Sequence, residues 1–512
     1  MSAAEDGWRR LDRRTVAVTA IVMAGVAIGA GVPTTVGIAS NTSLGTALLW
    51  VVPAGLLLIA IGAGWDYLRW YKTWYRIGDE RAELRTGILV RTRRSLHRDR
   101  IRAVDLTADP ITRIFGLANV KIGTGESSAP GTSSFVLRPV TAATAEQLRR
   151  ELLDRPVGDT ATAEGMLAEL DPAWVRYAPT SFLAPLLGIG AFGVVMNVSE
   201  WFGLQKGVIE WVADLFSGLP LVVTILVLIA LALVLGSIGS LLLFVEMWWR
   251  FRLERESGGT LRVRRGLLTT RSISLEEKRL RGLEVVEPLG ARMLGAARVD
   301  IIATGMVQRK DDDKTDHRTV LPPAPKDIAD RVAADVLREE VAPTNSARLA
   351  GHPRAARGRR IRWALAAVVA VVLPLLVLGV LLTDVLLHLA WIAALVLLPI
   401  AILIALDSYR ALGHGLTGDY LVARNGSVRR STVALQRRGI IGWTARQSVF
   451  QRRAGLITLT ATTAAGTGGY SVHDVGASEG LVFAEAAVPD LFAPFLEGPL
   501  PRRADETVSG EV

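Results

Sequence analysis

Six long apolar stretches constrain this chain more than any other feature of its sequence. A helix needs about 20 apolar residues to cross the hydrocarbon core of a bilayer. Stretches that reach or approach this length lie at residues 15–40, 44–64, 180–198, 219–245, 363–382 and 385–406. Each odd stretch is followed closely by an even one. The sequence therefore predicts six transmembrane helices in three hairpins, at 15–64, 180–245 and 363–406, of which the glycine-rich stretch 180–198 is the weakest.

Composition agrees with a membrane protein. Half of the 512 residues are hydrophobic, and the mean hydropathy of +0.33 is high for a soluble protein of this length. The net charge of +10 would suit nucleic acid, anionic lipid or the positive-inside bias of membrane proteins. Because apolar spans are present, the positive-inside bias takes precedence. Cysteine is absent, which excludes disulfides, a thiol nucleophile and cysteine metal ligands.

Basic residues set the expected orientation. They precede the first span and the fifth, and they follow the second, fourth and sixth, whereas the short turns around Asn41 and Asp384 contain neither Lys nor Arg. By the positive-inside rule, both termini and all three large polar segments face the cytoplasm of a multi-pass protein in the inner cell membrane. The longer turn 200–218 fits a short amphipathic helix on the outer surface or an ordinary polar turn equally well.

The polar segments after the three hairpins form an internal repeat. Each begins with a glycine and continues with an arginine and a second glycine at the same offsets. These residues are Gly87, Arg113 and Gly116, then Gly266, Arg292 and Gly295, and finally Gly426, Arg452 and Gly455. An acidic residue followed by Pro110 or Pro288 precedes the arginine in the first two segments, and the third segment lacks it. The sequence thus predicts module 1 at 68–155, module 2 at 248–341 and module 3 at 410–500.

Within each module the apolar residues mostly alternate with polar ones, as in strands that have one wet face. A helical pattern closes the modules at 142–153, 326–339 and 478–496, the last broken near Pro489. Five to seven short strands and a terminal helix are typical of a small curved β-sandwich or barrel with a helical plug. The predicted fold class is therefore an α+β membrane protein.

These residues and their spacing resemble the bacterial pleckstrin-homology-like membrane proteins of the YdbS/YdbT type. The likeness is carried by the leading glycine, the Arg-Ile or Arg-Leu pair at Arg100 and Arg279, and the run from Asp109 or Glu287 to the second glycine. The resemblance implies a bent seven-stranded sheet capped by one helix in each module. It implies no catalytic activity, and it suggests a role in envelope defence.

The sequence contains no motif for catalysis. It has no Walker-type loop, no His-Glu-x-x-His and no convincing nucleophile elbow. Asp384 with His388, or the acidic run 311–313, could bind a cation, but solvated turns account for both better. We therefore expect a protein that is not an enzyme and that has no cofactor and no resident metal.

Arginine clusters in all three modules are the remaining signal. The candidate contacts to an anionic surface are Arg91, Arg93, Arg94, Arg264, Arg265, Arg429, Arg430, Arg437 and Arg438. They could bind anionic headgroups of the inner leaflet, or they could merely satisfy the positive-inside bias and protect edge strands. The sequence leaves these two explanations open. Nucleic acid is disfavoured because few aromatic residues interleave with the arginines.

These observations favour a non-enzymatic scaffold whose cytoplasmic modules bind protein partners or the anionic leaflet, in envelope defence or export. The expected partners are the bilayer and a membrane or cytoplasmic protein, such as a smaller pleckstrin-homology-like membrane protein. The alternative is a component of a transport system for a peptide or lipid, supported by prolines and glycines in the spans. The scarcity of ionisable residues within the spans counts against transport.

The orientation can be tested with reporter fusions. Alkaline phosphatase fused after Arg155 or Arg338 should be inactive, and green fluorescent protein fused at the same residues should fluoresce. A fusion of phosphatase within the turn at Asn41 serves as the control and should be active. An active phosphatase after Arg155 or Arg338 would contradict the orientation.

Overall fold

The computed structural model describes residues 7–78, 80–88, 90–101, 103–123, 135–153, 165–180, 184–201, 204–256, 258–304, 318–489 and 491. The chain divides into two compact units, Met1–Arg279 and Leu280–Val512. Module 2 contributes its first strands to the first unit and its later strands to the second. The acidic run 311–313 lies outside the described residues.

Five helices in the described part of the chain are long and apolar enough to cross a bilayer. They are α1 (Thr15–Ala39), α2 (Leu44–Lys72), α7 (Leu221–Trp248), α11 (Arg354–Leu381) and α12 (Asp384–Arg410). The weak third stretch forms α5 (Ala184–Trp201), which passes the same test only together with the 3-10 helix η2 (Pro172–Thr180), to which it is bent by 79°. The described residues therefore contain five candidate spans, or six if this bent pair is counted as one.

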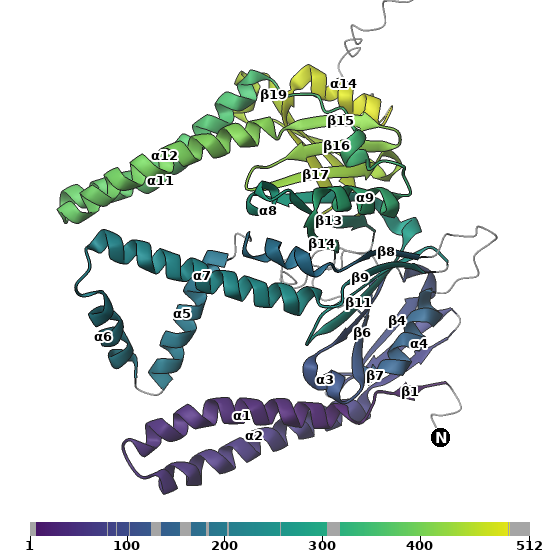
Figure 1. Ribbon diagram of the computed structural model, residues 1–512. Coiled ribbons are helices and arrows are strands. Elements are labelled where there is room, and N and C mark those ends of the chain that lie inside the picture. Colours follow the sequence, from purple (N-terminus) through teal and green to yellow (C-terminus); the bar gives the residue numbers. More distant parts are fainter. Residues whose placement is uncertain are drawn as a thin grey trace, which may run out of the picture. The chain divides into compact units, whose positions relative to one another are not determined.

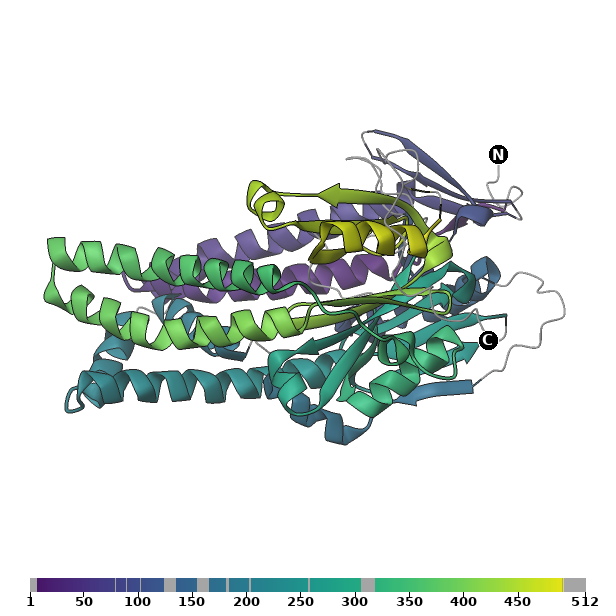
Figure 2. The same ribbon diagram turned by 90° about the horizontal axis from the view of Figure 1, so that it is seen from above.

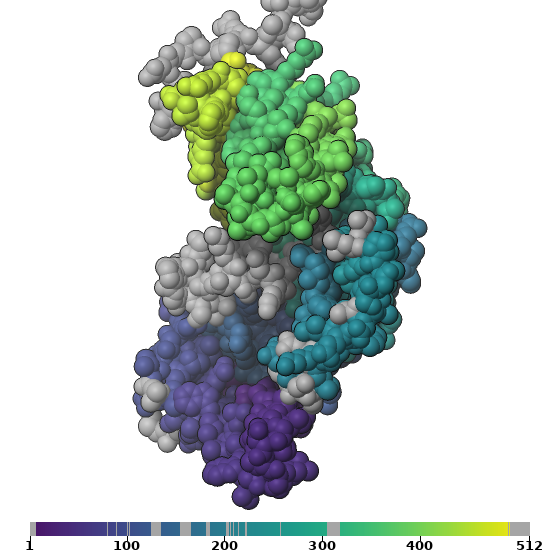
Figure 3. All heavy atoms as spheres, turned by 90° about the vertical axis from the view of Figure 1, so that its left-hand side faces the viewer, coloured from purple at the N-terminus to yellow at the C-terminus, as the bar shows by residue number. Residues whose placement is uncertain are grey.

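The apolar helices pack in antiparallel pairs through small residues. A side chain on Gly31 would come within 3.2 Å of Val51 across α1 and α2, and one on Gly379 would collide with the backbone at Leu387 across α11 and α12. Small residues allow such close approach in lipid. Figure 2 shows α11 and α12 side by side, and in Figure 3 the atoms of α11 and α12 (green) form one continuous mass. The turn between α5 and α7 contains the short helix α6 (Gln205–Phe216), as the amphipathic-helix interpretation expected.

The first unit contains two sheets (Figure 1). The four-stranded sheet has the order β1-β2-β3-β4, formed by β1 (Arg9–Arg10), β2 (Trp74–Ile77), β3 (Arg81–Thr86) and β4 (Thr92–His97). The seven-stranded sheet has the order β7-β6-β5-β11-β10-β9-β8. Its strands are β5 (Ala103–Ala108), β6 (Leu117–Gly123), β7 (Phe135–Thr141), β8 (Gly165–Glu169), β9 (Arg252–Glu256), β10 (Thr260–Arg265) and β11 (Thr270–Glu276). Because β5 belongs to module 1 and β11 to module 2, the two modules share this sheet.

The second unit repeats the arrangement. Its six-stranded sheet has the order β14-β13-β12-β17-β16-β15, and a three-stranded sheet has the order β18-β19-β20. The module 2 strands are β12 (Leu280–Pro288), β13 (Ala296–Ala303) and β14 (Thr319–Pro325). The module 3 strands are β15 (Gly413–Thr417), β16 (Tyr420–Asn425), β17 (Arg429–Gln436), β18 (Ile440–Arg446), β19 (Leu456–Thr463) and β20 (Gly469–Gly476). Here β12 of module 2 pairs with β17 of module 3.

Both joints between modules use the same register. Ala103 pairs with Leu275 in the first joint, and Gly282 pairs with Leu435 in the second. Each leucine lies nine residues after the leading glycine of its own module, and each partner lies sixteen residues after the leading glycine of the preceding module. Successive modules are therefore connected by one repeated antiparallel interface.

Modules 1 and 3 each enclose a hydrophobic core. In module 1, Leu84 from the first sheet packs with Val104 and Val120 from the second and with Leu148 of α4 (Ala142–Leu153). Module 3 encloses a comparable core, which includes α14 (Ala477–Ala487). The helix that follows β14 is α9 (Lys326–Leu337). The predicted small β-modules with a terminal helix are confirmed, although α9 and α14 end before the predicted residues.

Acidic residues near the ends of α7 and α12 accept hydrogen bonds from the turns that begin with Gly266 and Gly426. The Glu246 carboxylate at the end of α7 accepts hydrogen bonds from the backbone N–H groups of Leu268 and Thr269, both at 3.0 Å. Asp407, at the end of α12, accepts one from the Ser427 hydroxyl at 2.6 Å. These contacts couple a module to the membrane helix that precedes it.

The repeat glycines are required by backbone geometry in all three modules. Gly87, Gly266 and Gly426 have φ values of +139°, +112° and +91°, and a Cβ on any of them would lie about 2 Å from a backbone oxygen. The second glycines follow the short helices α3 (Pro110–Ile114), α8 (Leu289–Met293) and α13 (Val449–Arg453) and adopt φ values of +64° to +69°. Left-handed backbone of this kind favours glycine. The third segment is therefore a true copy of the repeat, despite its weaker sequence.

Replacing a leading glycine should destabilise the protein. We expect Gly266→Ala to lower the free energy of unfolding by about 1–3 kcal/mol, the range for a non-glycine residue held in a sparsely populated conformation. Thermal unfolding of the purified chain measures the effect. Gly165→Ala is the matched control, because its Cβ would meet no atom within 4 Å and its φ is not positive. Equal melting temperatures for the two variants would contradict the argument.

Candidate functional site

A cavity of about 900 Å³ lies where module 1 meets module 2 in the first unit. Its walls come from the shared sheet and from one face of α4, including Ala142, Ala145 and Glu146. Trp249 and Arg250, which directly follow α7, also line it. The arginines on its lining are Arg113, Arg250, Arg252, Arg262, Arg264, Arg265 and Arg271, against two glutamates, Glu146 and Glu169. The cavity is therefore strongly basic.

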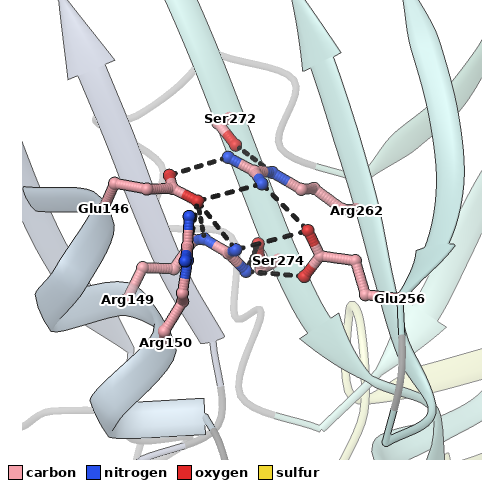
Figure 4. A network of polar contacts seen from close by, with 7 residues as sticks. All are labelled: Glu146, Arg149, Arg150, Glu256, Arg262, Ser272 and Ser274. Carbon is pink, nitrogen blue, oxygen red and sulfur yellow. Dashed lines mark hydrogen bonds and ion pairs between the residues drawn. The ribbon is translucent and has the colours of Figure 1, made fainter. Parts of the chain in front are cut away.

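Figure 4 shows a ring of alternating charges, two members of which, Glu146 and Arg262, also line this cavity. Arg149 donates to Glu256 at 2.7 Å and to Glu146 at 2.9 Å, and Arg262 donates to Glu146 at 2.8 Å and to Glu256 at 2.9 Å. Both guanidinium groups are about 95% buried. Arg262 also donates to Ser272 at 2.9 Å. Burial without partners would be costly, so the ring holds α4 of module 1 against β9 and β10 of module 2.

The ring changes the ionisation of its carboxylates. Burial alone would raise the pKa of Glu146, but hydrogen bonds from Arg149 and Arg262 outweigh it and lower the pKa from 4.5 to about 2. The pKa of Glu256 is lowered too, because the same two arginines outweigh its burial. Both groups are therefore negative at neutral pH, and the ring is neutral overall.

Positive charge remains beyond the ring. Arg252 lies directly opposite Arg264 on neighbouring strands, an unfavourable arrangement for like charges. Arg252 is compensated by Glu169 at 3.0 Å, whereas Arg264 has no ion pair within the described part of the chain. Burial, and secondly the nearby Arg262, lower the pKa of the Arg264 guanidinium. An anion in the cavity would relieve this repulsion, and guanidinium groups suit phosphate and carboxylate oxygens.

Only two of the nine predicted surface arginines, Arg264 and Arg265, reach this cavity. Arg265 is buried, with its guanidinium 4.1 Å from the centre of the Trp248 ring. Arg93 bonds Glu83 on the neighbouring strand, and Arg91 and Arg94 lie close to it at β4. The nine arginines are thus distributed over several surfaces rather than gathered on one.

The remaining predicted arginines lie in module 3 and have partners within the second unit. Arg429 bonds Glu284 at 3.3 Å, and Arg430 bonds Asp407 at 3.4 Å. Arg437 donates to the backbone oxygens of Ala486 and Ala487 at the end of α14. Arg438 is exposed and bonds Gln436.

The sequence did not single out Arg149 or the ring around it. A signal for it exists, because Arg149 shares the buried face of α4 with Ala145, Leu148 and Leu152. An arginine on the apolar stripe of a helix needs a buried partner. Arg113 and Arg292 were identified only as repeat residues, yet both reach the next repeat. Arg113 donates to the Leu267 backbone oxygen of module 2 at 2.7 Å, and Arg292 donates to Asp407 of α12, the helix before module 3, at 2.8 Å.

Comparison with known protein families also finds three repeats in the chain. The pattern of the bacterial PH domain matches residues 18–156, 206–340 and 362–487, which together cover most of the chain. The chain belongs to the bacterial PH domain family. Each match includes membrane helices as well as the module that follows them.

One relative matches along nearly the whole chain. The protein is similar to the UPF0699 transmembrane protein YdbT of Bacillus subtilis (strain 168), with 22% identity over 440 residues, which cover 82% of this chain and 83% of the relative. No solved structure matches. The bacterial PH domain family therefore accounts for the repeated fold, and the resemblance seen in the sequence is confirmed. The described residues contain no group of three or more His, Cys, Asp or Glu side chains that could hold a metal ion.

The charged ring should make stability depend on acidic pH. Because the folded-state pKa of Glu146 is about 2 and its ordinary value is 4.5, its contribution is complete above about pH 4.5 and is lost as pH falls towards 2. At pH 7 we expect Glu146→Gln to melt at a lower temperature than the unmodified protein. Between pH 4.5 and pH 2 the melting temperature of the variant should fall less than that of the unmodified protein. Glu151→Gln on the same helix is the control. Identical pH profiles for the Glu146 variant and the unmodified protein would contradict the role of the ring.

Proposed function

We propose that the chain is a non-enzymatic membrane scaffold whose joined cytoplasmic modules bind the phosphate-bearing headgroup of an anionic lipid. The arginine-lined cavity between modules 1 and 2 is the observation that carries this proposal. Seven arginines and two glutamates line it, and Arg264 is left without an ion pair among the described residues. Fold alone does not fix the ligand of a PH-like domain, so the argument rests on this cavity.

The place of the cavity along the chain favours a lipid over a soluble anion. Trp249 directly follows α7 and is exposed, and aromatic rings of this kind prefer the headgroup depth of a bilayer. Trp249 and Arg250 also line the cavity. A headgroup from the inner leaflet would therefore find Trp249, Arg250 and Arg264 in the lining of one cavity.

The proposal includes the membrane arrangement. Six spans in three hairpins, with both termini in the cytoplasm, place every module beside the inner leaflet of the cell membrane. The basic flanks of the spans support this orientation. A protein partner from the membrane or cytoplasm would then meet a platform of joined modules, as a role in envelope defence or export requires.

Lipid selectivity of the full chain tests the function. Native mass spectrometry of the detergent-purified protein, titrated with phosphatidylglycerol or phosphatidylcholine, should show preferential retention of phosphatidylglycerol. Arg264→Glu should weaken phosphatidylglycerol binding by at least about fivefold, because one basic residue contributes about 1 kcal/mol near an anionic surface.

Arg138→Glu is the matched control, since Arg138 is an exposed residue of β7 that does not line the cavity. It makes the same change in net charge and should leave lipid binding unchanged. Equal retention of the two lipids by the unmodified protein would remove the headgroup proposal. Equal loss in both variants would reduce it to a general effect of net charge.

A further inference from the structure

The joint that connects consecutive modules has two unused halves. In each joint, the first strand of one module's second sheet (β5 or β12) pairs with the last strand of the next module's first sheet (β11 or β17). The strand of module 3 that corresponds to β5 and β12 is β18. The strand of module 1 that corresponds to β11 and β17 is β4. Among the described residues, β18 pairs only with β19 and β4 only with β3. No further strand in the described part of the chain takes the place of a partner for either of these two edges.

We propose that the chain associates head to tail with a second copy of itself, through β18 of one copy and β4 of the other. This interaction continues an interface that the chain already forms twice. Free strand edges readily accept another strand, because their backbone N–H and C=O groups are unsatisfied. Since the two surfaces differ, the contact is heterologous and can extend or close into a ring.

The internal joints fix the register of this contact. Counting from the leading glycines, Gly442 takes the place of Ala103 and Gly282, and Leu96 takes the place of Leu275 and Leu435. The pairs would then run antiparallel from Gly442 with Leu96 to Arg446 with Thr92. Thr444 would lie opposite Arg94.

Burial along the strands supports an unoccupied interface. Within the joints, Ser274 and Ala434 are fully buried, whereas their counterpart Ser95 on β4 is exposed. On β18, Thr444, Ala445 and Arg446 are exposed, although their counterparts on β12, Glu284 to Val286, are buried. Both strands thus have the exposure of joint strands whose partner is missing.

A complementary pair of charges lies beside these edges. In the second joint, Arg292 of module 2 donates to Asp407 at the end of α12 at 2.8 Å. The counterpart of Arg292 in module 3 is Arg452, which is exposed. Near the end of α2, the helix before module 1, lies Asp66, which is 9% exposed and whose Oδ2 is buried with no hydrogen-bond partner among the described residues. Arg452 of one copy would supply the cation that Asp66 of the other lacks.

The absence of cysteine from the chain makes the contact directly testable. Two differently tagged full-length copies are co-expressed, one carrying Thr444→Cys and the other Arg94→Cys, and native membranes are oxidised. A disulfide-linked heterodimer should form. His97→Cys in place of Arg94→Cys is the control, because its Cα lies about 10 Å further along the strand. Equal cross-linking of both pairs, or none, would overturn the proposed interface.

The charge pair gives a second, independent readout. Arg452→Glu in the copy with Thr444→Cys should reduce the heterodimer by at least about tenfold, because it leaves the buried Asp66 carboxylate facing a like charge. Arg453→Glu, at the exposed neighbouring position, should leave the yield unchanged. Cross-linking of Thr444→Cys only to a different protein would show that the second copy is the wrong occupant. An unchanged yield in Arg452→Glu would also contradict the proposal.

Discussion

Antiparallel pairing between strands of consecutive modules is the interaction on which the rest of this structure depends. A PH-like module on its own exposes the edge of its second sheet, with backbone groups that require partners. Here β5 is completed by β11, and β12 by β17. The backbone hydrogen bonds of one module are therefore satisfied by the next, so the modules form continuous sheets rather than independent domains on separate tethers.

Charged contacts add direction to this backbone pairing. The ring of Arg149, Glu146, Arg262 and Glu256 joins the terminal helix of one module to the strands of the next, and each buried charge has opposite charges beside it. Such a ring contributes specificity because only one register brings all its members together. Arg113 and Arg292 add a contact that recurs in both joints, although its acceptor differs between them.

The basic cavity follows from the same joint. Its arginines come mainly from the first strands of module 2, while α4 and β5 of module 1 supply other lining residues. Neither module contains the cavity alone. Repetition of a small PH-like domain thus produces a basic cavity, because the contact between copies creates a surface that one copy lacks. The proposed headgroup site lies at such a joint, whereas the module cores maintain the fold.

The sequence by itself determined the apolar helices, the threefold repeat and the small β-modules with a terminal helix, because hydrophobic length and periodicity are local properties. It also identified Gly87, Gly266 and Gly426, whose backbone geometry excludes a side chain. Only the tertiary structure decided that modules share sheets, that Arg149 enters a buried ring, and that Arg264 and Arg265 line a cavity while Arg429 and Arg430 are paired elsewhere. These facts depend on which strand edges meet, and strand pairing between distant segments leaves no periodic signal in the sequence.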